Sequence, residues 1–164
     1  MTEHSQLPAV PIDPLADAWE AAWTGVRPFA LCCTPDVHYE DPLTSEPLDG
    51  LAALERHAER LRAGFPDLRV ERTAERLATP THACIPWRLA GTHRGDTGPL
   101  TATGRFVVVH GLHYVELDGE LIRRARGFFD LYETGVQLGT LPARGGFGEA
   151  ALLMLRGFGL RARG

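Results

Sequence analysis

The sequence contains no lysine, and all 17 of its basic residues are arginine. This absence excludes chemistry that depends on a lysine amine, such as Schiff-base catalysis and an internal pyridoxal phosphate linkage. It also excludes a Walker A phosphate loop, which needs its lysine. Any aldol or isomerase chemistry must therefore use other acid–base groups.

Cysteine is scarce, and the three present are Cys32, Cys33 and Cys84. Their odd number and the adjacent pair argue against a disulfide framework, and no CxxC or HExxH spacing indicates a metal site. We therefore expect buried thiols in a reducing cytoplasm, with no metal and no cofactor.

No apolar run approaches the ~20 residues of a membrane span, and residues 1–10 lack a signal-peptide pattern. The net charge is −4, so the chain lacks the basic footprint typical of nucleic-acid binders. We expect a cytoplasmic protein with neither a membrane nor a nucleic acid as partner. Its 164 residues suit one domain.

The hydrophobic period changes along the chain. A period near 3.6 predicts helices at 13–25, 51–64, 131–138 and 149–158. Period-two alternation predicts strands at 37–40, 68–74, 82–91, 104–117 and 121–131. This order predicts an α+β fold in which helices pack on one face of a curved antiparallel sheet. We expect an arm at 1–12, the domain at 13–140 and an extension with a short helix at 141–164.

Two of the predicted strands carry further signals. Pro86 removes a ladder hydrogen bond from strand 82–91, so we expect an edge position or a bulge there. Strand 104–117 is apolar on both faces, and the helices can cover only one. The other face predicts a homodimer.

A set of short motifs resembles the SnoaL-like polyketide cyclases, also called ester cyclases, of the nuclear-transport-factor-two-like superfamily. In chain order they are YEDP (39–42), GL (50–51), FPDL (65–68), WRLAGTHRG (87–95), TGR (103–105), His113, DGELI (118–122), RGFFD (126–130) and QLG (137–139). The resemblance implies a cone-shaped sheet wrapped around three helices and an apolar pocket, in a dimer joined through the outer sheet face.

The resemblance also implies that Asp130 is the general acid/base. Asp130 follows Phe128 and Phe129, and we expect such apolar neighbours to raise its pKa. The alternative is a turn residue paired with Arg126. His113 stands in the position where the resemblance implies a partner for the aspartate, although a mid-strand histidine is often only a core residue.

Other side chains are candidates for substrate binding. Tyr39 and Asp41 share a strand face and could bind a ketone or ester oxygen, unless Asp41 only caps the next turn. Arg88 could hold a substrate carboxylate or enolate, or pair with Asp41 or Glu40. The remaining candidates are Trp87, His93, Arg126 and Phe128.

These observations predict a cofactor-free cyclase that performs an intramolecular aldol step on a small apolar carbonyl compound. An epoxide hydrolase or isomerase is an alternative, and hydrolysis would need a second carboxylate near Asp130, for which Asp41 is the candidate. A non-enzymatic dimeric protein that binds a hydrophobic molecule is the other alternative.

Overall fold

The computed structural model describes residues 11–98 and 100–159. The predicted arm at 1–12 lies mostly outside the described residues. The elements, in chain order, are α1 (Ile12–Trp23), the 3-10 turn η1 (Phe29–Leu31), β1 (Cys33–Glu40), β2 (Leu48–Asp49), α2 (Leu51–Gly64), β3 (Arg69–Arg72), β4 (Leu77–Ala78), β5 (His82–Thr92), β6 (Phe106–Asp118), β7 (Leu121–Phe129), α3 (Leu131–Leu138) and α4 (Phe147–Gly159).

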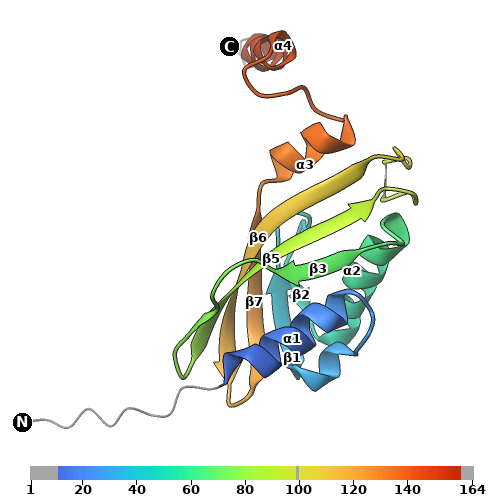
Figure 1. The fold of residues 1–164 in the computed structure, drawn as a ribbon. Coiled ribbons are helices and arrows are strands. Elements are labelled where there is room, and N and C mark those ends of the chain that lie inside the picture. The colour runs from blue at the N-terminus through green and yellow to red at the C-terminus, as the bar shows by residue number, and fades with distance from the viewer. Residues whose placement is uncertain (1–10, 99, 160–164) are drawn as a thin grey trace, which may run out of the picture.

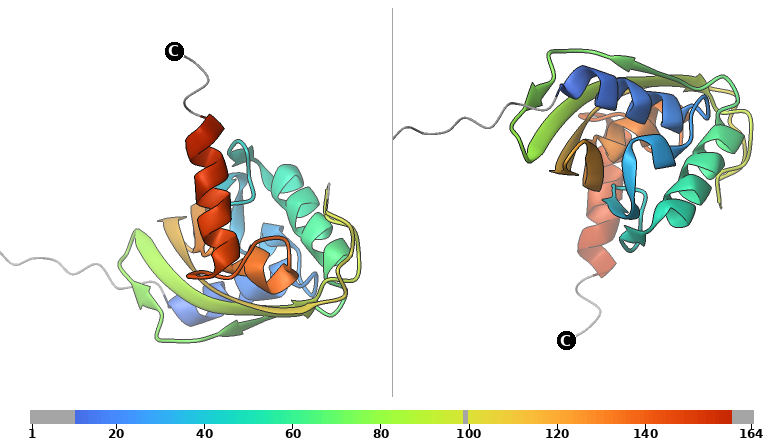
Figure 2. Two further views of the ribbon diagram at one scale, coloured as in Figure 1. Left: turned by 90° about the horizontal axis from the view of Figure 1, so that it is seen from above. Right: turned by 90° about the horizontal axis from the view of Figure 1, so that it is seen from below.

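The fold is the predicted α+β class, with one curved sheet in the order β2-β1-β7-β6-β5-β3 and β4 paired to β5 (Figure 1). The pairings are antiparallel except that β1 lies parallel to β7, which the sequence pattern did not indicate. Figure 2 shows α1 and α2 on the concave side of this sheet, and Figure 1 shows α3 and α4 at one end of it.

Side-chain alternation explains the core. The α1 residues Leu15, Trp19, Ala22 and Trp23 are buried against the inner face of the sheet, as their helical spacing predicts. On β6, Val107, Val109, Val115 and Leu117 are buried, whereas Phe106 and Tyr114 are exposed on the opposite face. The two faces predicted for this strand are therefore confirmed.

Pro86 lies where β5 changes partners. On one side β5 pairs continuously with β6, but on the other its partner changes from β4 at Cys84 to β3 at Trp87. The proline stands between these two pairings, where its missing N–H breaks no ladder. The predicted local edge is confirmed.

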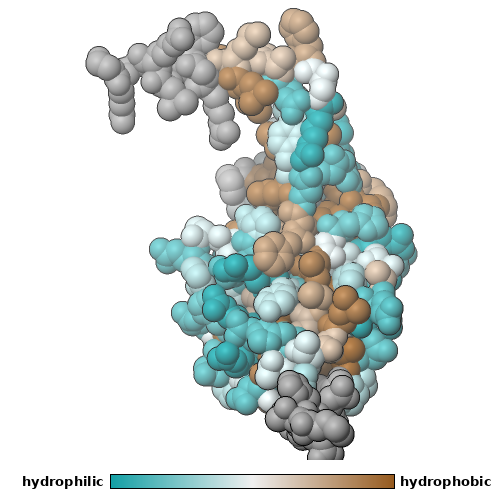
Figure 3. Space-filling view, turned by 90° about the vertical axis from the view of Figure 1, so that its left-hand side faces the viewer, coloured by the Kyte–Doolittle hydropathy of each residue, from teal (hydrophilic) through white to brown (hydrophobic). Residues whose placement is uncertain are grey.

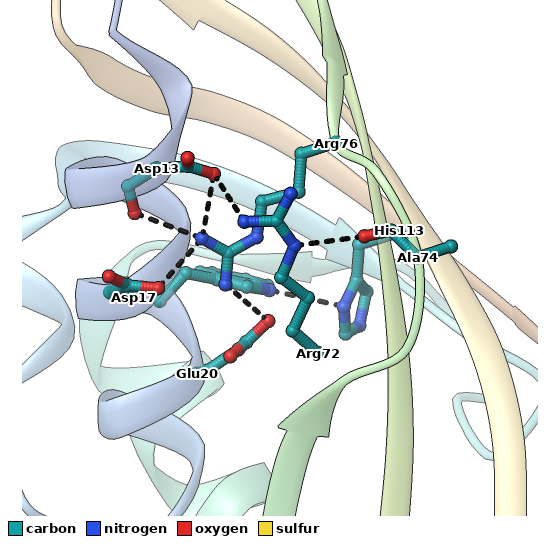
Figure 4. Close-up of polar contacts among 8 residues, drawn as sticks. Asp13, Asp17, Glu20, Arg72, Ala74, Arg76 and His113 are labelled. Carbon is teal, nitrogen blue, oxygen red and sulfur yellow. Dashed lines mark hydrogen bonds and ion pairs between the residues drawn. The ribbon is translucent and has the colours of Figure 1, made fainter.

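A buried arginine fastens the connection between β3 and β4 to α1. The Arg76 side chain is 2% exposed, and its guanidinium bonds Asp17 at 2.7 Å, Glu20 at 2.9 Å and Asp13 at 3.1 Å (Figure 4). Arg72, which is 44% exposed, also bonds Asp13. This Arg76 cluster stabilises the position of α1 over the sheet.

Two smaller expectations need correction. The helix predicted at 13–25 is α1, which begins at Ile12 after the N-cap Pro11 and ends at Trp23. Cys32 and Cys33 are buried and all three thiols are free, but Cys84 is only half-buried.

No helix of the described residues is long and apolar enough to cross a membrane.

Candidate functional site

The inner face of the sheet holds a chain of hydrogen bonds centred on Asp41. Its Oδ2 accepts the hydroxyl of Tyr39 at 2.9 Å and lies 2.9 Å from Nε2 of His57. Its Oδ1 accepts the backbone N–H groups of Leu43 at 2.7 Å and Thr44 at 3.1 Å. Asp41 therefore caps its turn, as one interpretation of the sequence held, and it also joins Tyr39 to His57. Its binding of a ketone or ester oxygen stays a prediction.

The two ends of this hydrogen-bond chain fix the direction of every hydrogen bond in it. The Trp19 indole can only donate, and it donates to Nδ1 of His113 at 3.1 Å. The proton of the neutral His113 ring is therefore on Nε2, which lies 3.4 Å from the Tyr39 oxygen. Because Tyr39 gives its own proton to Asp41, Nε2 of His113 donates to Tyr39. The His57 Nε2 must also donate, since a carboxylate accepts only.

Burial and charge set the protonation states along this chain. Burial lowers the pKa of His113 to about 3, against the opposing pull of Asp41, so its ring is neutral near pH 7. Burial alone would raise the pKa of Asp41, but His57, Tyr39 and the Leu43 N–H together hold it below its usual range. Burial and the Asp41 charge raise the pKa of Tyr39 well above its ordinary value. Asp41 is therefore a stable anion.

Aromatic rings fill the space around His113. Trp23 stacks on the His113 ring with the centroids 5.8 Å apart, and the Trp87 centroid lies at 5.3 Å. The indole N–H groups of Trp23 and Trp87 are buried, and neither has a hydrogen-bond partner among the described residues. Trp19 and Trp23 both belong to the hydrophobic core between α1 and the sheet.

Two glycines allow this packing. A Cβ at Gly127 would lie 3.0 Å from the Tyr39 hydroxyl and 3.1 Å from Cβ of Asp41. A Cβ at Gly111 would overlap the Trp87 ring. Strand pairing continues through Gly111 without a bulge, so it provides space for the indole and does not redirect the exposed His110.

A cleft of about 340 Å³ opens beside the network. Its lining comes from the end of β1, the following loop and the end of β7: Glu40, Asp41, Pro42, Thr44, Ser45, Glu46, Pro47, Arg126, Gly127 and Phe128. Asp41 and Gly127 therefore connect the buried hydrogen-bond chain to a recess large enough for a small ligand. Among residues 11–98 and 100–159, no three His, Cys, Asp or Glu side chains are grouped as metal ligands would be.

The prediction that Asp130 lies among apolar neighbours is wrong. Its side chain is 49% exposed, accepts the Glu133 N–H at 2.9 Å as the N-cap of α3, and pairs with Arg144 at 2.6 Å. The Glu133 N–H, followed by the Arg144 charge, lowers its pKa, so the expected rise does not occur. Asp130 starts the next turn, as the alternative held, but it pairs with Arg144 and not with Arg126.

Several other candidates also lie outside the network. Arg88 pairs with Glu71 on the outer face, not with Asp41 or Glu40. Arg126 pairs with Glu40, and Phe128 beside it is 47% exposed. His93 is fully buried, but its ring nitrogens contact Thr97 and Thr103. Side-chain alternation shows which residues share a face with Arg88 on β5 and with Phe128 on β7. It could not show which face of the sheet points towards the helices.

His57 is the site residue that the sequence analysis missed. Its side chain is 10% exposed, and it lies on the buried face of α2 with Leu54, Ala58 and Leu61. The spacing of these residues was visible in the sequence. A titratable residue within that apolar stripe was the signal that could have identified it.

Comparison with known proteins agrees with this architecture. The model of the SnoaL-like polyketide cyclase family matches residues 14–138. A search of curated proteins finds no match. IdmH of Streptomyces antibioticus, a proposed polyketide cyclase, is 17% identical with a TM-score of 0.68, over 79% of this chain and 99% of its own.

Two further solved structures show the same fold. AclR of Streptomyces galilaeus, a proposed hydroxylase, is 20% identical with a TM-score of 0.66, over 79% of this chain and 85% of its own. A protein of Catenulispora acidiphila with a ketosteroid isomerase-like fold is 22% identical with a TM-score of 0.65, over 77% and 93%. At these identities the likeness shows the fold alone.

Proposed function

The chain belongs to the SnoaL-like polyketide cyclase family, and from that premise we propose that it is a cofactor-free cyclase acting on a small carbonyl compound. The observation that carries the proposal is the Asp41–His57 pair, with Oδ2 and Nε2 2.9 Å apart and side chains 5% and 10% exposed. A carboxylate that fixes the tautomer of an imidazole leaves the other ring nitrogen as a proton acceptor.

The proposed reaction uses His57 as base and then as acid. Because Nε2 donates to Asp41, Nδ1 of His57 is left to take a proton from the carbon beside a carbonyl. The resulting enolate carbon attacks a second carbonyl of the same molecule and forms a carbon–carbon bond. The new alkoxide takes the proton back from Nδ1, so no group is consumed. The Asp41 charge stabilises the imidazolium between these steps.

The other groups support this assignment. His113 is a poor base, because Trp19 occupies its Nδ1 and its Nε2 carries the proton. Asp130 is exposed and paired to Arg144. We place the substrate in the cleft that Asp41 lines.

The test compares substitutions at His57 and at two carboxylates, Asp41 and Asp130. His57→Gln and Asp41→Asn should each lower turnover of a cyclisable 1,5-diketone by roughly 10²–10⁴-fold. Asp130→Asn keeps a good N-cap and should retain near-wild-type turnover. Product is measured by NMR in D₂O, where deuterium at the donor carbon reports proton abstraction separately. Loss of activity in Asp130→Asn with full activity in His57→Gln would reject the assignment.

Binding without turnover is the second candidate function. It is favoured by the four hydrogen bonds that occupy the Asp41 carboxylate. If the wild-type protein neither exchanges nor cyclises 1,5-diketones and aromatic polyketones, but these compounds quench its tryptophan fluorescence, binding is the better description.

A further inference from the structure

The helix α4 exposes large apolar side chains that residues 11–98 and 100–159 leave largely uncovered. Phe147 is 94% exposed, and the consecutive residues Leu152, Leu153, Met154 and Leu155 are 38%, 61%, 66% and 71% exposed. Consecutive residues of an α-helix are rotated by about 100°, so four in a row surround its axis. Leu152 is the most shielded of the four, and among the residues that the structure describes none fully covers any side of this stretch. Such exposure is unusual for a helix with water as its only neighbour.

The start of α4 is nevertheless anchored to the domain. The Tyr132 hydroxyl on α3 donates to the Pro142 carbonyl at 2.8 Å, and Arg144 pairs with Asp130 while lying over the Tyr132 ring. Figure 1 shows α4 beyond α3, away from the sheet, and Figure 3 shows hydrophobic residues gathered near that end. The connection holds the helix outward instead of folding it onto the domain.

The charge of residues 141–164 indicates which kind of surface α4 contacts. Residues 141–164 contain four arginines and one glutamate, a net charge of +3, so with −4 for the whole chain the remaining residues carry −7. Three of these arginines, Arg156, Arg161 and Arg163, follow the apolar run in the sequence. Apolar residues next to arginines suit a surface that is apolar below an anionic layer.

We propose that α4 docks the protein on an anionic lipid surface. With 13 residues the helix is about 20 Å long, too short to cross a bilayer core of about 30 Å, so it lies in the interface. The sequence alone led us to expect no membrane partner, because no run is long enough to span one. A helix that lies on the surface does not need that length. This proposal is independent of the cyclase assignment.

The experiment is sedimentation of the full-length protein with vesicles. We expect binding to vesicles that mix phosphatidylcholine with the anionic lipid phosphatidylglycerol, weaker binding at high salt, and little binding to vesicles of phosphatidylcholine alone. The double substitution Leu153→Gln with Leu155→Gln should lower the partition coefficient about tenfold or more. Leu31→Gln, at an apolar residue of η1 that is 60% exposed, is the matched control and should bind as the wild type does.

Charge substitutions test the second half of the proposal. Arg161→Gln should weaken binding about fivefold, and Arg163→Gln by a similar factor. No binding to the anionic vesicles, or equal binding to both compositions, would overturn the proposal. So would light scattering in which the Leu153 and Leu155 double variant changes a dimer to a monomer without affecting vesicle binding, because α4 would then cover a second copy of the chain.

Discussion

Replacing Arg76 by methionine should destabilise the fold more than any other single loss of charge in the Arg76 cluster. The guanidinium is 2% exposed and bonds three carboxylates of α1, of which Glu20 is only 12% exposed. Removing one partner of a buried ion pair typically costs about 3–5 kcal/mol, because the other charge is left without compensation. Asp13 and Asp17 are 58% and 69% exposed and regain water, so the cost arises mainly at Glu20.

The pH dependence identifies Glu20 as the origin of this cost. Burial already raises the pKa of Glu20, although Arg76 opposes the rise. A carboxyl group whose pKa is raised on folding favours the folded state at low pH, and this benefit is lost as pH rises through the folded pKa. Without Arg76 the pKa rises further. The destabilisation of Arg76→Met should therefore be small near pH 4 and grow towards pH 7.

Urea unfolding followed by tryptophan fluorescence measures both effects, since Trp19 and Trp23 are buried in the core. Arg72→Met is the matched control, because Arg72 is 44% exposed and should contribute less than about 1 kcal/mol. The double variant Arg76→Met with Glu20→Gln should recover part of the loss at pH 7. An Arg76→Met protein with wild-type stability, or with a cost that does not change with pH, would refute this reasoning.

Three further outcomes follow from the site and the sheet. His113 binds its proton more weakly in the folded state, with a pKa of about 3. The free energy of unfolding should therefore fall by up to about 1.4 kcal/mol per pH unit as the pH drops below 6.5. Urea titrations should show a smaller dependence of this free energy on pH for His113→Gln. Gly127→Ala should displace Tyr39 from Asp41, and it should therefore lower both the turnover rate and the free energy of unfolding. An unchanged turnover rate would contradict the close approach of Gly127 to Tyr39. The homodimer predicted through the outer sheet face remains a prediction: light scattering should show a dimer for the wild type and a monomer for Tyr114→Asp.

Most of the helices and strands could be predicted because hydrophobic periodicity and helix-breaking residues are signals within each segment. The helix at 51–64 matched α2 completely, and strand 104–117 differed from β6 by two residues at its start and one at its end. The strand predicted at 37–40 was too short, because β1 begins at Cys33 and continues through Pro35. Its parallel pairing with β7 is a long-range choice that no local pattern specifies. The Arg76 cluster was missed for the same reason, since it joins residues about 60 positions apart.

The candidate site was predictable only as far as side-chain alternation reaches. Alternation placed Tyr39 and Asp41 on one face, and the structure joins both to His113 in one hydrogen-bond chain. Alternation could not establish whether a carboxylate at a strand end is buried. Asp130 has the apolar neighbours that suggested burial, but the chain turns into α3 at that residue and directs the carboxylate to the helix N–H groups and Arg144. Asp41 also ends a strand and caps a turn, but the turn leaves its second oxygen facing inward, where α2 supplies His57. The acid–base pair therefore depends on the packing of a helix against a strand, and neither segment reveals it alone.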